Sequence, residues 1–232
     1  MTHRSHQLLD RIGAAAGVAS VLLLVALFTV FPALPGPDDS IGEIARSARE
    51  DRDGLLLGAY VGALLTGALI LFGASVAARL RRVEGAGGGW WLVALVGVAG
   101  TSIGIVGNAL EIMFVRAVGH GAAGSALWIG YGADHWFGTL LGIPLAVFLL
   151  GAGLGARATG VLPRWLAWLG IALSPLLAAG AGSVTGDELD GGILGLPLLV
   201  GYLGLLVWIV AASISMLRRP ASATAEPAAA LT

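Results

Sequence analysis

The chain contains no cysteine and no lysine, and only 12% of its 232 residues are charged. Without cysteine it has no disulfides, no thiolate metal ligands and no thiol redox chemistry. All 13 basic residues are arginine, which excludes a Schiff base to a retinal-like or carbonyl ligand. Any catalysis therefore depends on carboxylates, histidines, arginines or hydroxyl groups.

Apolar residues are abundant: they make up 57% of the chain, and the mean hydropathy is +0.89. A soluble domain carries about 25% charged residues, so this composition indicates an integral membrane protein. We predict a single membrane domain over residues 1–219 and a disordered cytoplasmic tail over 220–232, which has almost nothing to bury. The formal net charge of −1 gives no attraction to nucleic acid, and no nucleic-acid partner is expected.

Six apolar stretches are each long enough to cross a lipid bilayer. They run over residues 12–34, 55–78, 90–115, 127–154, 165–182 and 193–217. Continuous runs of leucine, alanine and valine favour helices over barrel strands, which alternate in polarity at every second residue. The sequence therefore predicts an all-α fold, a polytopic six-transmembrane-helix bundle.

The distribution of arginine predicts the orientation of the bundle. If the chain crosses six times, one face carries Arg4, Arg11, Arg79, Arg81, Arg82, Arg157, Arg164, Arg218 and Arg219. The other face carries Arg46, Arg49, Arg52 and Arg116 among many acids. Loops that are rich in arginine stay in the cytoplasm, so both termini are expected to be cytoplasmic.

The longest polar segment between spans lies after the first of them. Ser40 and Glu43 form a capping-box pattern, and Ile44 and Ala48 then fall on one helical face. These residues predict a short amphipathic outer helix between the first and second spans. The favoured interpretation is a surface connector, and the alternative is a lid that gates a ligand.

Ionisable side chains inside a membrane helix cost about 2.5–3.5 kcal/mol at the bilayer centre, so each indicates a function or a structural reason. Within the predicted spans the candidates are Glu111, Asp134 and His135. On the third span Thr101 and Asn108 recur with Glu111 at helical spacing, and this polar stripe is expected to face the bundle interior.

Aromatic side chains accompany the candidates on the fourth span. Tyr131 lies three residues before Asp134 and four before His135, so the three share a helix face. Further candidate substrate-binding residues are Trp128, Trp136 and Phe137. We predict one pocket open to the outside, in which Glu111, Asp134 and His135 carry the proton or charge chemistry and the aromatic residues, Asn108 and Thr101 contact the substrate.

Two other interpretations of these residues remain open. Glu111 and Asp134 lie within about three turns of a helix end, where side chains reach the headgroup region. Glu111 is then neutralised by Arg116, and Asp134 caps its helix. A metal site from Glu111, Asp134, His135 and His120 lacks an HExxH or comparable spacing, so neither a metal nor a cofactor is expected.

Three segments carry a resemblance to a known group of proteins. They are the loop that runs into Gly54-Leu-Leu-Leu-Gly-Ala-Tyr60, the turn Arg79-Leu-Arg-Arg82, and the stretch from Gly160 to Gly170. With these segments the chain resembles a broad group of uncharacterised multi-pass membrane proteins of actinobacteria. The resemblance implies a six-helix fold in a bacterial plasma membrane and supplies no activity.

Three classes of function fit these observations. The favoured one binds or transports a small apolar or cationic ligand, a cation or a proton through intramembrane carboxylates. The first alternative is an intramembrane enzyme on a lipid-soluble substrate, in which a protonated carboxylic acid acts as general acid, as in a membrane terpene cyclase. The second is an accessory or structural subunit without chemistry. Oligomeric state is not specified by the sequence.

Overall fold

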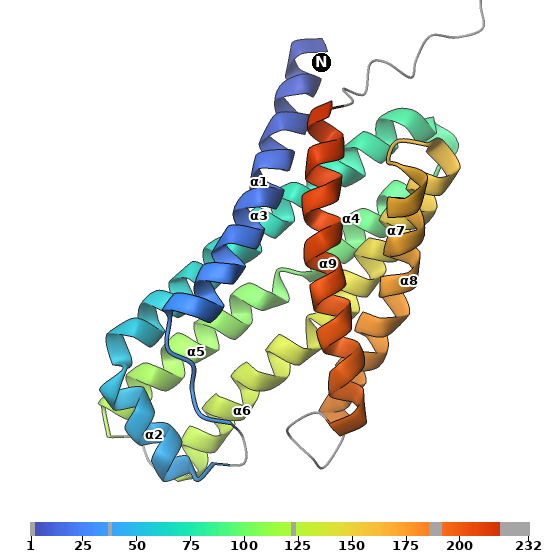
Figure 1. Ribbon diagram of the computed structural model, residues 1–232. Coiled ribbons are helices and arrows are strands. Elements are labelled where there is room, and N and C mark those ends of the chain that lie inside the picture. The colour runs from blue at the N-terminus through green and yellow to red at the C-terminus, as the bar shows by residue number, and fades with distance from the viewer. Residues whose placement is uncertain (1–2, 37–38, 122–123, 186–191, 219–232) are drawn as a thin grey trace, which may run out of the picture.

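The computed structural model describes residues 3–36, 39–121, 124–185 and 192–218 (Figure 1). All regular structure in these ranges is helical. The α-helices are α1 (His3–Val30), α2 (Ile41–Glu50), α3 (Arg52–Glu84), α4 (Trp90–Gly100), α5 (Ile103–Gly119), α6 (Ser125–Leu140), α7 (Gly142–Thr159), α8 (Arg164–Ala181) and α9 (Gly192–Arg218). Short 3₁₀ turns follow α3 at Gly85–Gly87 and α8 at Gly182–Thr185.

Six helical segments in the described ranges are long and apolar enough to cross a membrane. They are Gln7–Val30, Arg52–Glu84, Trp90–Gly119, Ser125–Thr159, Arg164–Ala181 and Gly195–Arg218. The predicted all-helical fold with six hydrophobic spans is thereby confirmed. The tail predicted over 220–232 lies outside the described residues.

The spans alternate in direction, so the bundle has two distinct ends (Figure 1). The beginning of α1, the end of α3, the turn between α7 and α8, and the end of α9 meet at one end. This basic end carries Arg81, Arg82, Arg157, Arg164 and Arg218. Helix α2 lies at the opposite end, which we call the α2 end.

The first span ends earlier than the hydropathy pattern indicates. Apolar residues continue to position 34, but α1 ends at Val30. The next residue, Phe31, precedes Pro32, and a residue before proline is disfavoured in the α conformation. Residues 31–36, which we call the strap, contain no helix and run towards α2.

The third and fourth spans are each broken near their middle. Between α4 and α5 the Thr101 and Ser102 hydroxyls bond the carbonyl oxygens of Val98 and Ala99 at 2.6 and 2.7 Å. Such local bonds compete with the helical ladder. Between α6 and α7 the break at Leu141 comes just before Pro144, which has no backbone N–H to continue the ladder.

Glycines allow the broken spans to approach each other closely. An added Cβ at Gly97 of α4 would lie 2.8 Å from the Pro144 carbonyl oxygen, and one at Gly100 would lie 2.7 Å from the Pro144 Cβ. These contacts agree with the expectation that small residues in lipid serve close helix packing. They join α4 to α7.

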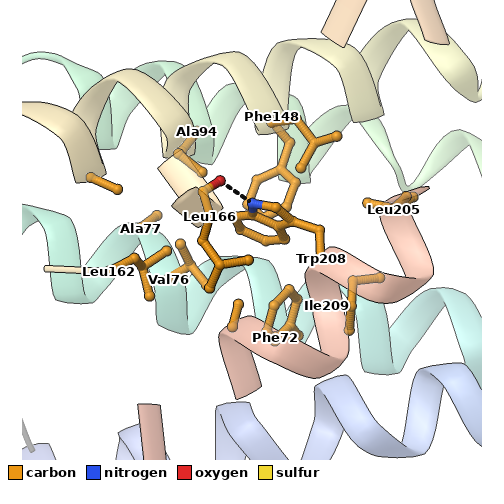
Figure 2. Packing of buried hydrophobic residues seen from close by; sticks show 14 of the residues in the cluster. Phe72, Val76, Ala77, Ala94, Phe148, Leu162, Leu166, Leu205, Trp208 and Ile209 are labelled. Atoms are coloured by element: carbon orange, nitrogen blue, oxygen red, sulfur yellow. Dashed lines mark hydrogen bonds between the residues drawn. The ribbon is translucent and has the colours of Figure 1, made fainter. Parts of the chain in front are cut away.

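The core towards the basic end is built around three aromatic rings (Figure 2). Trp208 packs edge-on against Phe72 and Phe148, with ring centroids 6.0 and 5.6 Å apart. Its indole Nε1 donates a 2.9 Å hydrogen bond to the Leu166 carbonyl oxygen. The buried indole N–H thus has a hydrogen-bond acceptor although it is shielded from solvent. One apolar cluster joins α3, α7, α8 and α9.

A buried ionic cluster joins α1, α3 and α9 near the basic end. Asp10 of α1 is only 5% exposed. Its carboxylate accepts from the Arg82 guanidinium and lies 3.7 Å from Nη1 of Arg79. Arg79 also donates to the Met216 carbonyl oxygen at 3.3 Å. Because buried charges need partners, this cluster fixes the position of α1 against α3.

Helix α2 begins with the capping box that the sequence predicts. The Ser40 side chain accepts from the Glu43 backbone N–H, and the Glu43 carboxylate accepts from the Ser40 backbone N–H at 3.1 Å. Ile44, Ala45 and Ala48 are buried in a second apolar cluster with residues of α3, α5 and α6. Helix α2 is therefore docked on the bundle.

Candidate functional site

A cavity of ≈ 550 Å³ lies in the half of the bundle near the α2 end. Its described lining comes from α1, the strap, α3, α5, α6 and α9. The apolar lining residues are Leu27, Phe28, Pro32, Ala33, Leu34, Gly58, Gly138 and Leu198, and the polar ones are Asn108, Glu111, Tyr131, Thr139 and Tyr202. The cavity thus combines an apolar wall with a few converging polar groups, as small-molecule sites do.

The carboxyl group of Glu111 is the one ionisable acid among the described lining residues. Glu111 is half-buried on α5. It lies eight residues before Gly119, where α5 ends, which corresponds to about 12 Å along the helix axis. The side chain is therefore held within the span, at a depth where a charge calls for a function or a partner.

Asn108 lies one turn before Glu111 and is held by the helix backbone. Its side-chain nitrogen donates to the Gly104 carbonyl oxygen. The amide packs against Gly62 of α3, where an added Cβ would overlap the Asn108 oxygen. Asn108 therefore serves helix packing and presents a polar edge to the cavity at the same time.

Tyr131 of α6 joins the cavity wall to the strap. Tyr131 is only 5% exposed, and its ring centroid lies 6.0 Å from those of Phe114 and Trp128. Its hydroxyl donates a 2.7 Å hydrogen bond to the Pro35 carbonyl oxygen. The strap is thereby held over the cavity, to which it contributes Leu34.

On the opposite side, Tyr202 of α9 reaches α6. Its hydroxyl donates a 3.4 Å hydrogen bond to the Gly138 carbonyl oxygen. An added Cβ at Gly138 would meet no heavy atom within 4 Å. Gly138 is an exposed lining residue of the cavity, so a larger side chain is accommodated there without overlap.

The cavity occupies only one half of the bundle. Near the basic end, α1 and α9 are in contact: an added Cβ at Gly13 of α1 would lie 3.4 Å from the Met216 side chain. The two helices then diverge towards the α2 end, where α5 and α6 lie behind them (Figure 1). The other half holds the packed rings of Phe72, Phe148 and Trp208.

Three of the residues predicted from the sequence line this cavity together: Asn108, Glu111 and Tyr131. Three others do not. Thr101 is 3% exposed at the break between α4 and α5, Trp128 is 41% exposed, and Phe137 is half-buried on α6. The side chains of Asp134, His135 and Trp136 lie outside the described residues, so their pairing with Glu111 stays a prediction.

The contribution of α1, the strap and α9 to the cavity was not predicted from the sequence, although the sequence carries a signal for two of them. Tyr202 is the one tyrosine of the last span. A polar phenol within an apolar run was the feature that could have indicated a cavity residue there. For the strap the signal was Pro32, which disfavours helix at Phe31, together with Pro35 within the non-helical segment that follows α1.

Within the described residues, no group of three or more His, Cys, Asp or Glu side chains is placed to hold a metal ion. Comparisons of the chain with protein-family models, with curated proteins and with solved structures find no match. Function is therefore inferred from the chemistry of the cavity.

Proposed function

We propose that this protein binds a small lipid-soluble ligand that carries a cationic group, with Glu111 as the anionic anchor. The observation that carries the proposal is the position of one acidic side chain in a cavity whose wall is otherwise largely apolar. An ionised carboxylate attracts a cation more strongly in such surroundings than in water. An apolar body matches Leu27, Phe28 and Leu198.

The size and the polar groups of the cavity agree with such a ligand. A volume of ≈ 550 Å³ lies within the range of about 300–1,000 Å³ that small-molecule sites occupy. The hydroxyls of Tyr131 and Tyr202 and the amide of Asn108 donate to backbone carbonyls, so their oxygens are the groups that accept hydrogen bonds from a polar head. The rings of Phe28, Tyr131 and Tyr202 in the lining also favour a cation.

Binding is favoured over passage through the protein, because the packed rings of Phe72, Phe148 and Trp208 fill the other half of the bundle. Transport of the same ligand requires a second arrangement of these helices. It is distinguished from binding by uptake of the ligand into vesicles that contain the purified protein.

An intramembrane acid–base enzyme is the second candidate, and a carboxyl group beside two phenols in one cavity favours it. In that case protonated Glu111 acts as general acid on an alkene or epoxide. Trp128 and Phe137 do not line the cavity, which leaves fewer ring faces to stabilise a carbocation. Lipid profiles that are identical in a deletion strain and its parent would argue against this alternative.

The binding proposal is tested with tetraphenylphosphonium, a permanent cation with an apolar body. Its affinity for the purified full-length protein in detergent is measured by titration calorimetry. Glu111→Gln keeps the size of the side chain and removes the charge, so the Coulomb attraction is lost and the affinity should fall roughly tenfold or more. The matched control Glu50→Gln, at an exposed position at the end of α2, should leave the affinity unchanged. Equal affinity for the protein and the Glu111→Gln variant would contradict the proposal.

We further propose that the basic end is cytoplasmic, in a bacterial plasma membrane, because arginine-rich ends of spans stay inside. Since the chain has no cysteine, single cysteines report the side without background. Glu50→Cys at the α2 end should react with a membrane-impermeant thiol reagent in intact cells, and Gly89→Cys before α4 should react only after lysis. The reverse labelling pattern would show that the α2 end, and not the basic end, is cytoplasmic.

A further inference from the structure

A second groove, of ≈ 500 Å³, lies on the bundle surface near the basic end, between α1, α3 and α4. Its floor is formed by Ala74, Ala77 and Ala78 of α3, whose small side chains leave a channel along the helix. The walls are Leu9 of α1 and Leu95 and Trp91 of α4. The described lining contains no acidic residue.

Two arginines, Arg81 and Arg82, close the groove at the end of α3. The floor and these arginines extend over residues 74–82, about 12 Å along the helix. The Arg81 guanidinium lies 4.9 Å from the Trp91 ring centroid. A tryptophan beside an arginine at the end of a span is typical of the headgroup level of a membrane. The groove therefore runs from that level along the apolar part of α3.

Positive charge exceeds negative charge at this end of the groove. Asp10 is shared by Arg79 and Arg82, while Arg81 is exposed. The nearby acid Glu84 accepts from the backbone N–H groups of Trp90 and Trp91 at the start of α4. Among the described residues, Nε and Nη1 of Arg82 are buried and have no hydrogen-bond acceptor.

We propose that this groove binds an anionic phospholipid, with its phosphate at Arg81 and Arg82 and an acyl chain along the alanine floor. The excess of guanidinium groups complements a phosphate that carries net negative charge, and the apolar walls complement the acyl chain. A zwitterionic phosphatidylcholine fits less well, because its trimethylammonium group meets the same arginines. Each arginine near the headgroups contributes about fivefold in affinity for anionic lipid.

The test uses native mass spectrometry of the full-length protein in detergent, titrated with phosphatidylglycerol or phosphatidylcholine. The protein should bind phosphatidylglycerol at least roughly fivefold more tightly than phosphatidylcholine. Arg81→Gln should remove most of this preference. Arg157→Gln is the matched control, because Arg157 at the same end stacks on Trp168 at 4.5 Å and lines no part of the groove. This control should bind as the unmodified protein does.

A third variant, Ala78→Leu, keeps every charge and fills the groove. Ala78 is exposed, so the larger side chain is accommodated without displacing the core, and binding of both lipids should fall. Unchanged lipid binding in Ala78→Leu, or identical binding in Arg81→Gln and Arg157→Gln, would overturn the proposal. So would displacement of phosphatidylglycerol by an equal concentration of glycerol phosphate, since the site would then recognise a soluble anion.

Discussion

The hydroxyl of Tyr131 donates a 2.7 Å hydrogen bond to the carbonyl oxygen of Pro35, 96 residues earlier in the chain. This bond fastens the strap to α6 beside the cavity. Pro35 cannot reach a helical partner, because α1 has already ended at Val30. The Pro35 carbonyl oxygen has no N–H donor from a helix, and the Tyr131 hydroxyl of another span supplies its hydrogen bond instead.

Tyr131→Phe should loosen the strap and leave the rest of the bundle intact. The lost hydrogen bond is worth about 1 kcal/mol, so transient opening should increase roughly fivefold. The change is measured as the rate at which Leu34→Cys, a half-buried strap position, reacts with a soluble thiol reagent. Tyr60→Phe is the control, because Tyr60 is 57% exposed on α3. If both substitutions gave the same labelling rate, the bond would not hold the strap.

The sequence predicted six spans, and the described part of the chain contains six helical segments that are long and apolar enough to cross a membrane. A run of about 20 apolar residues is the length that a spanning helix needs. The hydropathy pattern did not predict where α1 ends, nor the positions of the breaks at Thr101 and Leu141. Hydropathy averages over a window and is insensitive to hydroxyl groups that bond the backbone. The prolines Pro32 and Pro144 carried that information, although their effect depends on neighbouring helices.

Gly97 should tolerate no larger residue. An added Cβ there would overlap the backbone nitrogen of Phe148 and lie 2.8 Å from the Pro144 carbonyl oxygen, so α4 and α7 would have to separate. Gly97→Ala is expected to destabilise the protein by about 1–3 kcal/mol, measured as thermal unfolding in detergent. Gly67→Ala is the control, since an added Cβ there meets nothing within 4 Å. A neutral Gly97→Ala would show that this interface is not closely packed.

For the site, the sequence supplied part of the answer. Asn108 and Glu111 lie one turn apart on α5, so helical spacing alone brought them to one face. Tyr131 followed from its place on the next span. Thr101 belonged to the same stripe by spacing, but it lies at the break between α4 and α5, is buried, and does not line the cavity. Tyr202 was missed because its contact with α6 is set by tertiary packing, which periodicity does not report.

Acid should weaken the N-terminus of α2. Hydrogen bonds from the Ser40 side chain and from its backbone N–H, followed by the charge of Arg46, lower the pKa of Glu43 below its ordinary value of 4.5. Because the pKa of Glu43 is lower in the folded state, ionised Glu43 stabilises the fold. This stabilisation is complete above pH 4.5 and is lost as the pH falls through the lowered pKa. Hydrogen exchange of α2, corrected for intrinsic rates, should show less protection in acid. Glu43→Gln should abolish this pH dependence, and an unchanged dependence would exclude Glu43 as its source.

The most direct measurement for the central proposal compares two glycine variants in their affinity for tetraphenylphosphonium. Gly138 and Gly67 both have open space around an added Cβ, but only Gly138 lines the cavity. Gly138→Leu should fill the cavity and weaken binding roughly tenfold or more, because the volume for the ligand is lost. Gly67→Leu adds the same side chain outside the cavity and should bind as the unmodified protein does. Equal affinity in the two variants would contradict a ligand site beside Glu111.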